Sequence, residues 1–443
     1  MCGILAYYSN NDLQLQEFKE TLQKLRNRGQ DSCGISYIKD SKHNVVNEKT
    51  FNALSEKINN ISSKNIIGHT RYTTSGGKNT PIYQPFYSNN KFGDYAIAFN
   101  GNIPISKYLD KNTYESDTIM IIDFLNTMSY EYENWTELLK FFISYFEKSY
   151  NLLVQTKDSL FIVKDSFGVR PLYYSEKKYN NKYIFSSESY IFDNFDLPKE
   201  VKAGEILALN KYGLKKIFDY GRYYQSHCLF EYIYFLNSKS RFENMNVEDY
   251  RKKIGIILAQ QDLESKCFSN KEDYIVVGVP KTGNDYAIPY ASTIGIHYKN
   301  YITKNKNVNR TFILKDDTER NKFANLKYIL DDNLKGKNII VIDDSLVRGI
   351  TLKNLIQNLK QFGVNQVHIR IAAPPIINPC EFGIDIPTQK ELIYNTFNDT
   401  KKLQNFLNCD SLKYISVNKL VSVLPNSDNK CRLCFNNDPK LEW

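Results

Sequence analysis

The residue that follows the initiator methionine is a cysteine, Cys2. Removal of Met1 would leave a thiol and an α-amine on the same residue. These groups titrate near ~8.5 and ~8, so the amine can take up the thiol proton, directly or through a water. An N-terminal nucleophile activated by its own amine is a known catalytic arrangement. Many chains carry a cysteine here without such a role, so the rest of the sequence must decide between catalysis and chance.

Three polar motifs in the first half contain residues that an amide-hydrolysing pocket needs. Arg71 can bind an α-carboxylate through two parallel hydrogen bonds, and Asp117 can bind an α-ammonium group. Asn100 and the N–H of Gly101 can stabilise the oxyanion that forms when Cys2 attacks a side-chain amide. Each motif has a simpler explanation, since Arg71 can be a surface residue, Asn-Gly is a common hairpin turn and Ser-Asp-Thr is a common helix N-cap. Together they predict an amide-hydrolysing site.

A second group of polar residues lies in the other half of the chain. Asp343 and Asp344 follow an apolar run, and Ser345, Gly349 and Thr351 precede a helical pattern. The first turn of such a helix can bind a phosphate through its free N–H groups. Adjacent carboxylates can accept hydrogen bonds from ribose hydroxyls and lie beside Mg²⁺. A parallel strand with a polar end is the alternative, but the combination predicts a phosphosugar site.

The chain has eight cysteines. Cys431 and Cys434 have the spacing of a pair that binds one metal ion or cluster, or that forms a redox pair. In an intracellular chain of this size, cysteines indicate metal or redox chemistry more than disulfides.

Apolar patterns predict the elements that must position the first site. Residues 3–8 form an apolar run that would place Cys2 at a buried strand end. Large apolar residues fall on one helical face within residues 14–25, which predicts an amphipathic helix. A strand is expected over residues 35–38, and a helix over residues 119–125.

The character of the sequence changes after about residue 222. From Tyr274 onward, β-branched runs alternate with helical patterns, which favours a parallel sheet with helices on both faces. Residues 275–280 predict one strand, which ends in the loop 281–284. Residues 339–342 predict a second strand, and residues 352–362 the helix that follows it.

Composition is ordinary for a soluble globular protein, with 42% hydrophobic and 24% charged residues in 443. This length suits two or three domains. The sequence predicts neither a membrane span nor a secretory signal, so we expect a cytoplasmic protein. The net charge of +9 is spread along the chain, so a preference for anionic small molecules explains it as well as nucleic-acid binding does.

Short motifs of the first half resemble, in order and spacing, those of the class II glutamine amidotransferases: residues 2–4, 28–31, 68–72, 100–102, 116–118, 164–172, 185–189 and 204–207. The resemblance implies an N-terminal-nucleophile αββα sandwich over residues 2–222. It also implies roles in glutamine hydrolysis, with Cys2, Asn100 and Gly101 catalytic and with glutamine bound by Arg71, Asp117 and Arg28. Asn27 departs from the family pattern, which usually has histidine there, and we expect this to change packing only.

Motifs of the second half resemble the glutamine phosphoribosylpyrophosphate amidotransferases: residues 279–283, 309–313, 339–351, 373–375 and 380–385. The resemblance implies an α/β phosphoribosyltransferase domain with a mainly parallel sheet over residues 223–443, including a cysteine-bearing tail. It implies that phosphoribosylpyrophosphate (PRPP) is bound by Asp343, Asp344, Ser345, Arg348, Gly349, Thr351, Lys281, Thr282 and Arg310. Mg²⁺ would lie at Thr282, Asp343 and Asp344. Departures from the pattern are Asn307 and Asn309 in the flexible loop, and Ile350 and Leu352, which stand where hydroxyl residues are expected in the phosphate loop.

The resemblance as a whole implies an enzyme that hydrolyses glutamine and transfers the ammonia to PRPP, in the first committed step of purine synthesis. It further implies inhibition by purine nucleotides, a homotetramer, and a [4Fe–4S] cluster on Cys228, Cys380, Cys431 and Cys434, with Zn²⁺ as the physical alternative. A regulatory nucleotide-binding homologue is the competing interpretation, supported by the departures in the PRPP loops. Another class II amidotransferase is a third, but those lack the Asp-Asp loop.

Overall fold

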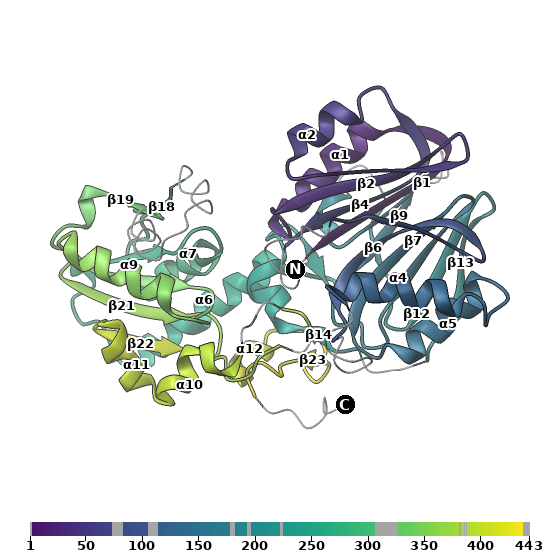
Figure 1. Ribbon diagram of the computed structural model, residues 1–443. Helices are drawn as coiled ribbons and strands as arrows, with labels where there is room; N and C mark the ends of the chain where they lie inside the picture. Colours follow the sequence, from purple (N-terminus) through teal and green to yellow (C-terminus); the bar gives the residue numbers. More distant parts are fainter. Residues whose placement is uncertain are drawn as a thin grey trace.

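The computed structural model describes residues 2–72, 83–104, 114–177, 182–192, 196–221, 225–305, 327–380, 382–384, 386 and 388–436. Figure 1 shows two lobes, one built from the first half of the chain and the other from the second. The predicted division between residues 222 and 223 falls in the segment 222–224, which lies outside the described residues.

Two stacked antiparallel sheets form the N-terminal lobe. The first has seven strands in the order β11-β9-β10-β1-β4-β2-β3, and the second has six in the order β13-β12-β8-β7-β6-β5. Helices α1 (Leu15–Lys24) and α2 (Phe51–Lys57) cover the first sheet, and α4 (Asp117–Met128) and α5 (Trp135–Tyr145) cover the second (Figure 1). The predicted αββα sandwich is therefore confirmed. The strands are β1 (Gly3–Gln14), β2 (Ser32–Lys39), β3 (Lys42–Glu48), β4 (Ser62–Arg71), β5 (Phe86–Asn90), β6 (Gly93–Asn102), β7 (Ser149–Thr156), β8 (Ser159–Lys164), β9 (Tyr173–Lys177), β10 (Lys182–Ser186), β11 (Lys199–Glu200), β12 (Glu205–Asn210) and β13 (Gly213–Asp219).

Strand β1 is buried on both faces, because it lies between helices and the second sheet. Leu5 packs in the cluster that contains the α1 residue Phe18, and Tyr7 meets the Phe18 ring edge-on at a centroid distance of 5.2 Å. Ile4 packs between the sheets, in a cluster that contains Ala98 of β6. Successive side chains of a strand point to opposite faces, so the continuous apolar run that follows Cys2 fills both layers. The nucleophile thus begins a strand that is fixed from two sides.

A parallel sheet is the centre of the C-terminal lobe, as predicted. Its order is β17-β20-β21-β22, with β17 at Tyr274–Gly278, β20 at Asn338–Asp343, β21 at Gln366–Ile371 and β22 at Ser411–Tyr414. Helices α6 (Val247–Glu264) and α7 (Thr282–Ile294) pack on one face, and α9 (Ile350–Gln361) and α11 (Thr400–Leu407) on the other (Figure 1). The carboxyl ends of β17 and β20 lie side by side.

Short elements connect the lobes or flank the parallel sheet. Strand β14 (His227–Cys228) pairs in parallel with β23 (Lys430–Cys431), which brings the tail beside the start of the second half. A π-helix, η4 (Glu231–Phe235), follows β14. The other strands and α-helices are β15 (Arg241–Phe242), β16 (Met245–Asn246), β18 (Ile302–Lys304), β19 (Tyr328–Leu330), α10 (Ile393–Phe397) and α12 (Val417–Val421). The 3₁₀-helices are η1 (Leu25–Asn27), η3 (Ser189–Ile191), η5 (Lys271–Asp273), η7 (Asp332–Leu334) and η8 (Gln389–Glu391).

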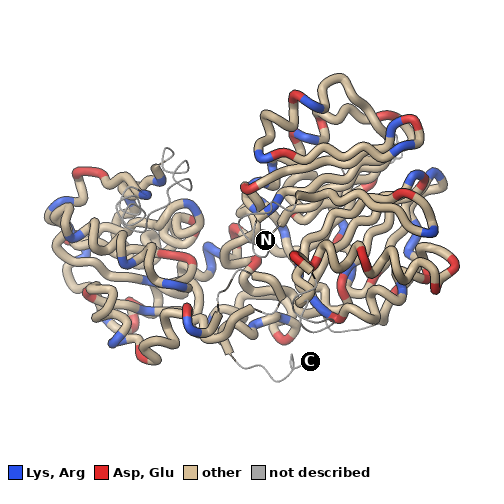
Figure 2. The backbone as a smooth tube through the Cα atoms, in the orientation of Figure 1, with Lys and Arg blue, Asp and Glu red and all other residues tan. Residues whose placement is uncertain are grey.

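Figure 2 shows basic and acidic residues interspersed over both lobes, which agrees with the even charge pattern of the sequence. Within the described ranges, no helix combines the length and the apolar character that a membrane crossing requires.

Candidate active sites

Cys2 lies at the start of β1, beside the end of β4. The antiparallel register pairs Gly3 with Thr70, which puts Cys2 next to Arg71. The Cys2 Sγ is 3.8 Å from the carbonyl oxygen of Tyr72. A Cβ at position 3 would lie 2.7 Å from Thr70 Oγ1, so glycine allows this close approach of the strands. The motifs around Cys2 and Arg71, which are about 70 residues apart in sequence, therefore meet in space.

The thiol of Cys2 is more acidic than an ordinary cysteine. Burial raises its pKa. This effect is outweighed by the charge of the neighbouring His69, a hydrogen bond with His69 and the charge of the amino terminus, which together lower the pKa to about 6. His69 is on β4, fully buried, with Nε2 3.2 Å from the carbonyl oxygen of Phe99. A thiol with this pKa is largely thiolate at neutral pH, and the thiolate is the nucleophilic form.

Asn100 lies near the end of β6, and its amide orientation is set by an arginine. Arg170 Nη1 donates to Asn100 Oδ1 at 3.3 Å, while Nδ2 of this buried amide has no hydrogen-bond partner among the residues that the structure describes. Because the oxygen is already engaged, Nδ2–H is the group that remains to donate. An oxyanion site requires a hydrogen-bond donor of this kind.

Asp117 is the first residue of α4, whose N-cap Ser116 accepts a hydrogen bond from the Ile119 N–H at 3.3 Å. The predicted cap is thus present, and Asp117 remains available for another role. The pKa of Asp117 is raised to about 6, mainly by burial and also by the charge of Cys2. Hydrogen bonds from Ile103 and Thr118 lower the pKa but do not outweigh burial. A cationic partner, such as an ammonium group, would stabilise the ionised form of this buried carboxylate.

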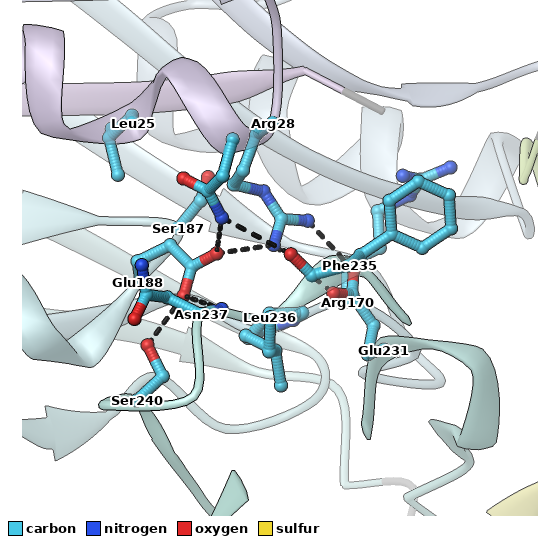
Figure 3. Close-up of polar contacts among 12 residues, drawn as sticks. Leu25, Arg28, Arg170, Ser187, Glu188, Glu231, Phe235, Leu236, Asn237 and Ser240 are labelled. Carbon is cyan, nitrogen blue, oxygen red and sulfur yellow. Dashed lines mark hydrogen bonds and ion pairs between the residues drawn. The ribbon is translucent and has the colours of Figure 1, made fainter. Parts of the chain in front are cut away.

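Arg28, expected among the glutamine-binding residues, has a different environment. Its guanidinium is fully buried and donates to the Cys2 carbonyl at 3.1 Å. It also donates to Glu188 at 3.2 Å and to Glu231 at 2.8 Å (Figure 3). The hydrogen bonds of Arg28 thus go to protein groups, among them the backbone of Cys2, and its contact with glutamine stays a prediction.

The second candidate site is formed by two loops at the carboxyl edge of the parallel sheet. Val279, just after β17, donates its N–H to the carbonyl oxygen of Ile342 on β20 at 2.9 Å. The loop before α7, with Lys281 and Thr282, therefore adjoins the loop that starts at Asp343. Since α7 and α9 lie on opposite faces of the sheet, the loops flank the position where an open α/β sheet binds ligands.

Asp343 and Asp344 form a coupled pair of carboxyl groups. Asp344 N–H donates to Asp343 Oδ1 at 2.9 Å, and Ser345 Oγ donates to Asp344 Oδ1 at 2.7 Å. Burial and the charge of Asp344 hold the pKa of Asp343 well above its usual range, and burial raises the pKa of Asp344 to about 6. Two neighbouring carboxyl groups that resist ionisation together would be relieved by a divalent cation or by hydroxyl donors.

The other predicted PRPP-binding residues have mixed surroundings. Gly349 is the N-cap of α9 with φ 77°, so it leaves the first N–H groups of the helix without a side-chain cap. Thr351 and Lys281 are exposed, and Thr282 is half-buried at the start of α7. Arg348 Nε donates to Glu391 at 3.0 Å on the surface. The predicted residues Arg310, Asn307 and Asn309 lie outside the described residues.

One residue is affected by charged groups of both sites. Tyr234 of η4, which is 47% exposed, has a pKa raised to about 12 by partial burial and by the charges of Asp344, Tyr72 and Asp343. Tyr72 adjoins Cys2, whereas the two aspartates belong to the second site, so one side chain lies within electrostatic reach of both.

The four cysteines of the predicted metal site are brought together. Cys228 is paired with Cys431 between β14 and β23. Burial, followed by the charges of Cys228, Cys380 and Cys431, raises the pKa of Cys434 well above its usual range. In the described part of the chain, no three His, Cys, Asp or Glu side chains are close enough to hold one metal ion.

Sequence reasoning missed three residues that surround the first site: His69, Arg170 and Glu231. His69 had a detectable signal, because it lies two residues before Arg71 on a strand and therefore on the same face. Arg170 and Glu231 had none in the local pattern, since their contacts with Asn100 and Arg28 join segments far apart in the sequence.

Known proteins with similar sequence and structure agree with this arrangement. A glutamine amidotransferase domain family matches residues 77–194. The amidophosphoribosyltransferase of Methanothermobacter thermautotrophicus is 32% identical, over 96% of this chain and 90% of that protein. The one of Methanocaldococcus jannaschii is 31% identical, over 98% and 96%. The structure of glutamine PRPP amidotransferase from B. subtilis, complexed with ADP and GMP, superposes with a TM-score of 0.86 at 28% identity, covering 99% of this chain and 97% of that one. The chain therefore belongs to the amidophosphoribosyltransferase family.

Proposed function

We propose that the protein is a glutamine-dependent amidophosphoribosyltransferase. It converts glutamine, PRPP and water into 5-phosphoribosylamine, glutamate and pyrophosphate. The observation that carries this proposal is the presence, in one chain, of an acidic N-terminal thiol with an oriented amide and of a second site at the Asp343–Asp344 loop. A glutaminase alone would not need the second site, and a phosphoribosyltransferase alone would not need the first.

At the first site, Cys2 is the nucleophile. Its sulfur attacks the side-chain amide carbon of glutamine, and the proton moves through the α-amine to the departing ammonia. Asn100 Nδ2 and the Gly101 N–H stabilise the oxyanion. Arg71 binds the α-carboxylate of glutamine and Asp117 its α-ammonium group. Water then hydrolyses the thioester and releases glutamate.

At the second site, ammonia attacks C1 of the ribose and pyrophosphate leaves. Asp343 and Asp344 accept hydrogen bonds from the ribose hydroxyls, while Ser345, Gly349 and Thr351 bind the 5′-phosphate at the start of α9. Lys281, Thr282, Arg348 and, in the segment outside the described residues, Arg310 complete the set that binds PRPP. Mg²⁺ held near Thr282, Asp343 and Asp344 would neutralise charge on the pyrophosphate. Because free ammonia would be lost to water, we expect the two lobes to shelter it as it passes between the sites.

We further propose that Cys228, Cys380, Cys431 and Cys434 hold a [4Fe–4S] cluster, with Zn²⁺ as the alternative. Their clustering and burial support this, and the cluster would tie the tail to the start of the second half. Iron, sulfide and zinc analysis of protein purified without oxygen separates the two metals. One equivalent of zinc without iron would overturn the cluster.

The remaining proposals concern organisation and regulation. We propose a glutaminase domain over residues 2–222 and a phosphoribosyltransferase domain over residues 223–443, in a cytoplasmic homotetramer. We also propose inhibition by purine nucleotides, which the nucleotide-bound B. subtilis structure supports.

One experiment tests the function directly. Pyrophosphate release from PRPP is measured with glutamine or with ammonium chloride as the nitrogen source, without oxygen. Cys2→Ser is expected to abolish the glutamine-dependent rate and to keep the ammonia-dependent rate. Equal loss of both rates would contradict separate sites, and no release by the wild-type protein with either source would favour a regulatory homologue.

A further inference from the structure

An arginine binds the backbone of the nucleophile, and a carboxylate from the other half of the chain binds that arginine. Figure 3 shows the pair of Arg28 and Glu231. Arg28 Nε donates to the Cys2 carbonyl at 3.1 Å. Its Nη1 and Nη2 donate to the two carboxylate oxygens of Glu231 at 3.1 and 2.8 Å. The side chains of Arg28 and Glu231 are both fully buried. Two parallel bonds fix the plane of the guanidinium, so the direction of Nε–H toward Cys2 depends on Glu231.

Glu188 completes the buried cluster but cannot replace Glu231. It accepts hydrogen bonds from Arg28 at 3.2 Å and Asn27 at 2.7 Å, from the Asn237 N–H at 3.3 Å and from Ser240 at 2.5 Å (Figure 3). Its oxygens are therefore already engaged. The fork of Arg28 that faces Glu231 would lose its partner if that carboxylate were removed.

The helix that carries Glu231 is itself fixed by elements of the second site. Arg251 of α6 donates to the carbonyl oxygens of Tyr232 and Leu236 at 3.0 and 2.8 Å. Tyr286 of α7 donates to that of Ile233 at 2.9 Å. Helix α7 begins at Thr282, in the loop beside the Asp343–Asp344 pair. Glu231 is thus anchored on the framework of the phosphoribosyl site.

We propose that Glu231 is a positioning residue for glutamine hydrolysis, acting through Arg28 on the Cys2 carbonyl. This inference rests on the proposed function, and it adds a dependence of the first site on a side chain of the second half. The carbonyl carbon of Cys2 is bonded to Cα, which carries the amine directly and the thiol through Cβ. A small rotation there displaces the nucleophile, and a displacement of about 1 Å costs on the order of 100-fold in rate.

Glu231→Gln tests the proposal, because it keeps the side-chain shape and removes the charge. The glutamine-dependent rate is expected to fall about tenfold or more, mainly in kcat, with the ammonia-dependent rate within about twofold of wild type. Glu231→Asp, which restores the charge at shorter reach, is expected to recover part of the loss. Asp262→Asn is the matched control, since Asp262 is a buried carboxylate of the same half, 2.5 Å from Arg370. Any destabilisation in the control should change both rates by the same factor.

The outcomes separate the inference from the function on which it rests. If Glu231→Gln lowers both rates in proportion, as Asp262→Asn would, or lowers neither, Glu231 does not position the nucleophile. A wild-type protein without ammonia-dependent pyrophosphate release would instead refute the proposed function. Thermal unfolding and iron content of each variant show whether the fold and the cysteine site are intact.

Discussion

At the residue scale, the reactivity of Cys2 depends on a few neighbours that oppose the cost of burial. Burial alone would keep the thiol protonated, whereas His69 and the amino terminus bring its pKa to about 6. Asn100 shows the same principle for an amide, because Arg170 engages its oxygen and leaves its N–H group to donate. Both effects arise from side chains outside the motifs that first indicated the site.

The acidity of Cys2 predicts a pH profile for alkylation. The thiolate reacts with iodoacetamide, so the rate should rise with pH through a midpoint near 6. His69→Gln removes the main group that lowers the pKa, so its midpoint should move up, toward the ordinary thiol value of about 8.5. Peptide mapping of the alkylated protein separates the modification of Cys2 from that of the other cysteines. The control His43→Gln, from the same lobe, should keep the wild-type midpoint, and an unchanged midpoint in His69→Gln would contradict the electrostatic role of His69.

The orientation of Asn100 predicts a separate effect of Arg170→Lys. Lysine keeps the charge but lacks the planar fork that reaches both Asn100 and the carbonyl oxygen of Phe382. Loss of one oxyanion donor costs about 100- to 1,000-fold in other enzymes, so we expect the glutamine-dependent rate to fall by about tenfold or more. Alkylation of Cys2 by iodoacetamide, which forms no oxyanion, should be unchanged. A parallel loss of alkylation would indicate general damage to the site.

At the element scale, the loop between β20 and α9 shows why two sequence departures differ in meaning. Ile350 and Leu352 both replace expected hydroxyl residues, yet Ile350 is 61% exposed and Leu352 only 3%. They are two residues apart in the first turn of a helix, so they point to different sides. Leu352 belongs to the apolar core, and its identity does not indicate a weakened phosphate site.

This difference in burial predicts that a hydroxyl residue at position 352 lowers stability much more than one at position 350. Leu352→Thr should lower the free energy of unfolding by about 2 kcal/mol or more, because it removes buried apolar atoms. Ile350→Thr should change stability by less than about 0.5 kcal/mol. Urea unfolding of the protein without substrates measures both. Tighter binding of ribose 5-phosphate by Leu352→Thr, at unchanged stability, would show that position 352 belongs to the ligand loop.

Local patterns predicted the elements that this site needs, but not the side chains that fix them. The apolar runs after Cys2 and before Asp343 predicted buried strands because both faces of each strand must be covered. Arg28 was predicted to bind glutamine because its motif resembles that of the class II glutamine amidotransferases. In the structure it pairs with Glu188 and Glu231, which are 160 and 203 residues away in the sequence. No periodicity encodes which distant carboxylates meet a given arginine, so this step required the fold.

At the scale of the whole molecule, a buried chain of alternating charges joins the lobes. Lys164 and Glu200 of the N-terminal lobe are 3.0 Å apart, and Glu200 lies 3.0 Å from His227 of β14. His227 contacts Glu243 at 2.9 Å, and Glu243 contacts Lys430 of β23 at 2.7 Å. Every charged group in this series contacts at least one group of opposite charge. Separating the lobes would leave buried charges without their partners, so the series stabilises the packed arrangement of the lobes.

Glu200 predicts how stability responds to acid. Burial raises its pKa, but Lys164 and His227 outweigh that effect and lower the pKa to about 2, against 4.5 for the model carboxyl group. A lowered folded-state pKa adds stability above the unfolded-state value, and this contribution is lost as the pH falls from about 4.5 to about 2.

Glu200→Gln should therefore lower the free energy of unfolding at pH 7 by up to about 3 kcal/mol, and the gap to wild type should narrow below about pH 4.5. Urea titrations at pH 7, 4 and 3 measure the gap. Glu17→Gln is the control, because its carboxylate is 58% exposed and 2.8 Å from Lys182, and exposed pairs contribute about 1 kcal/mol or less. A gap that stays constant down to pH 3 would mean that Glu200 stabilises the junction by packing and hydrogen bonding, not by its charge.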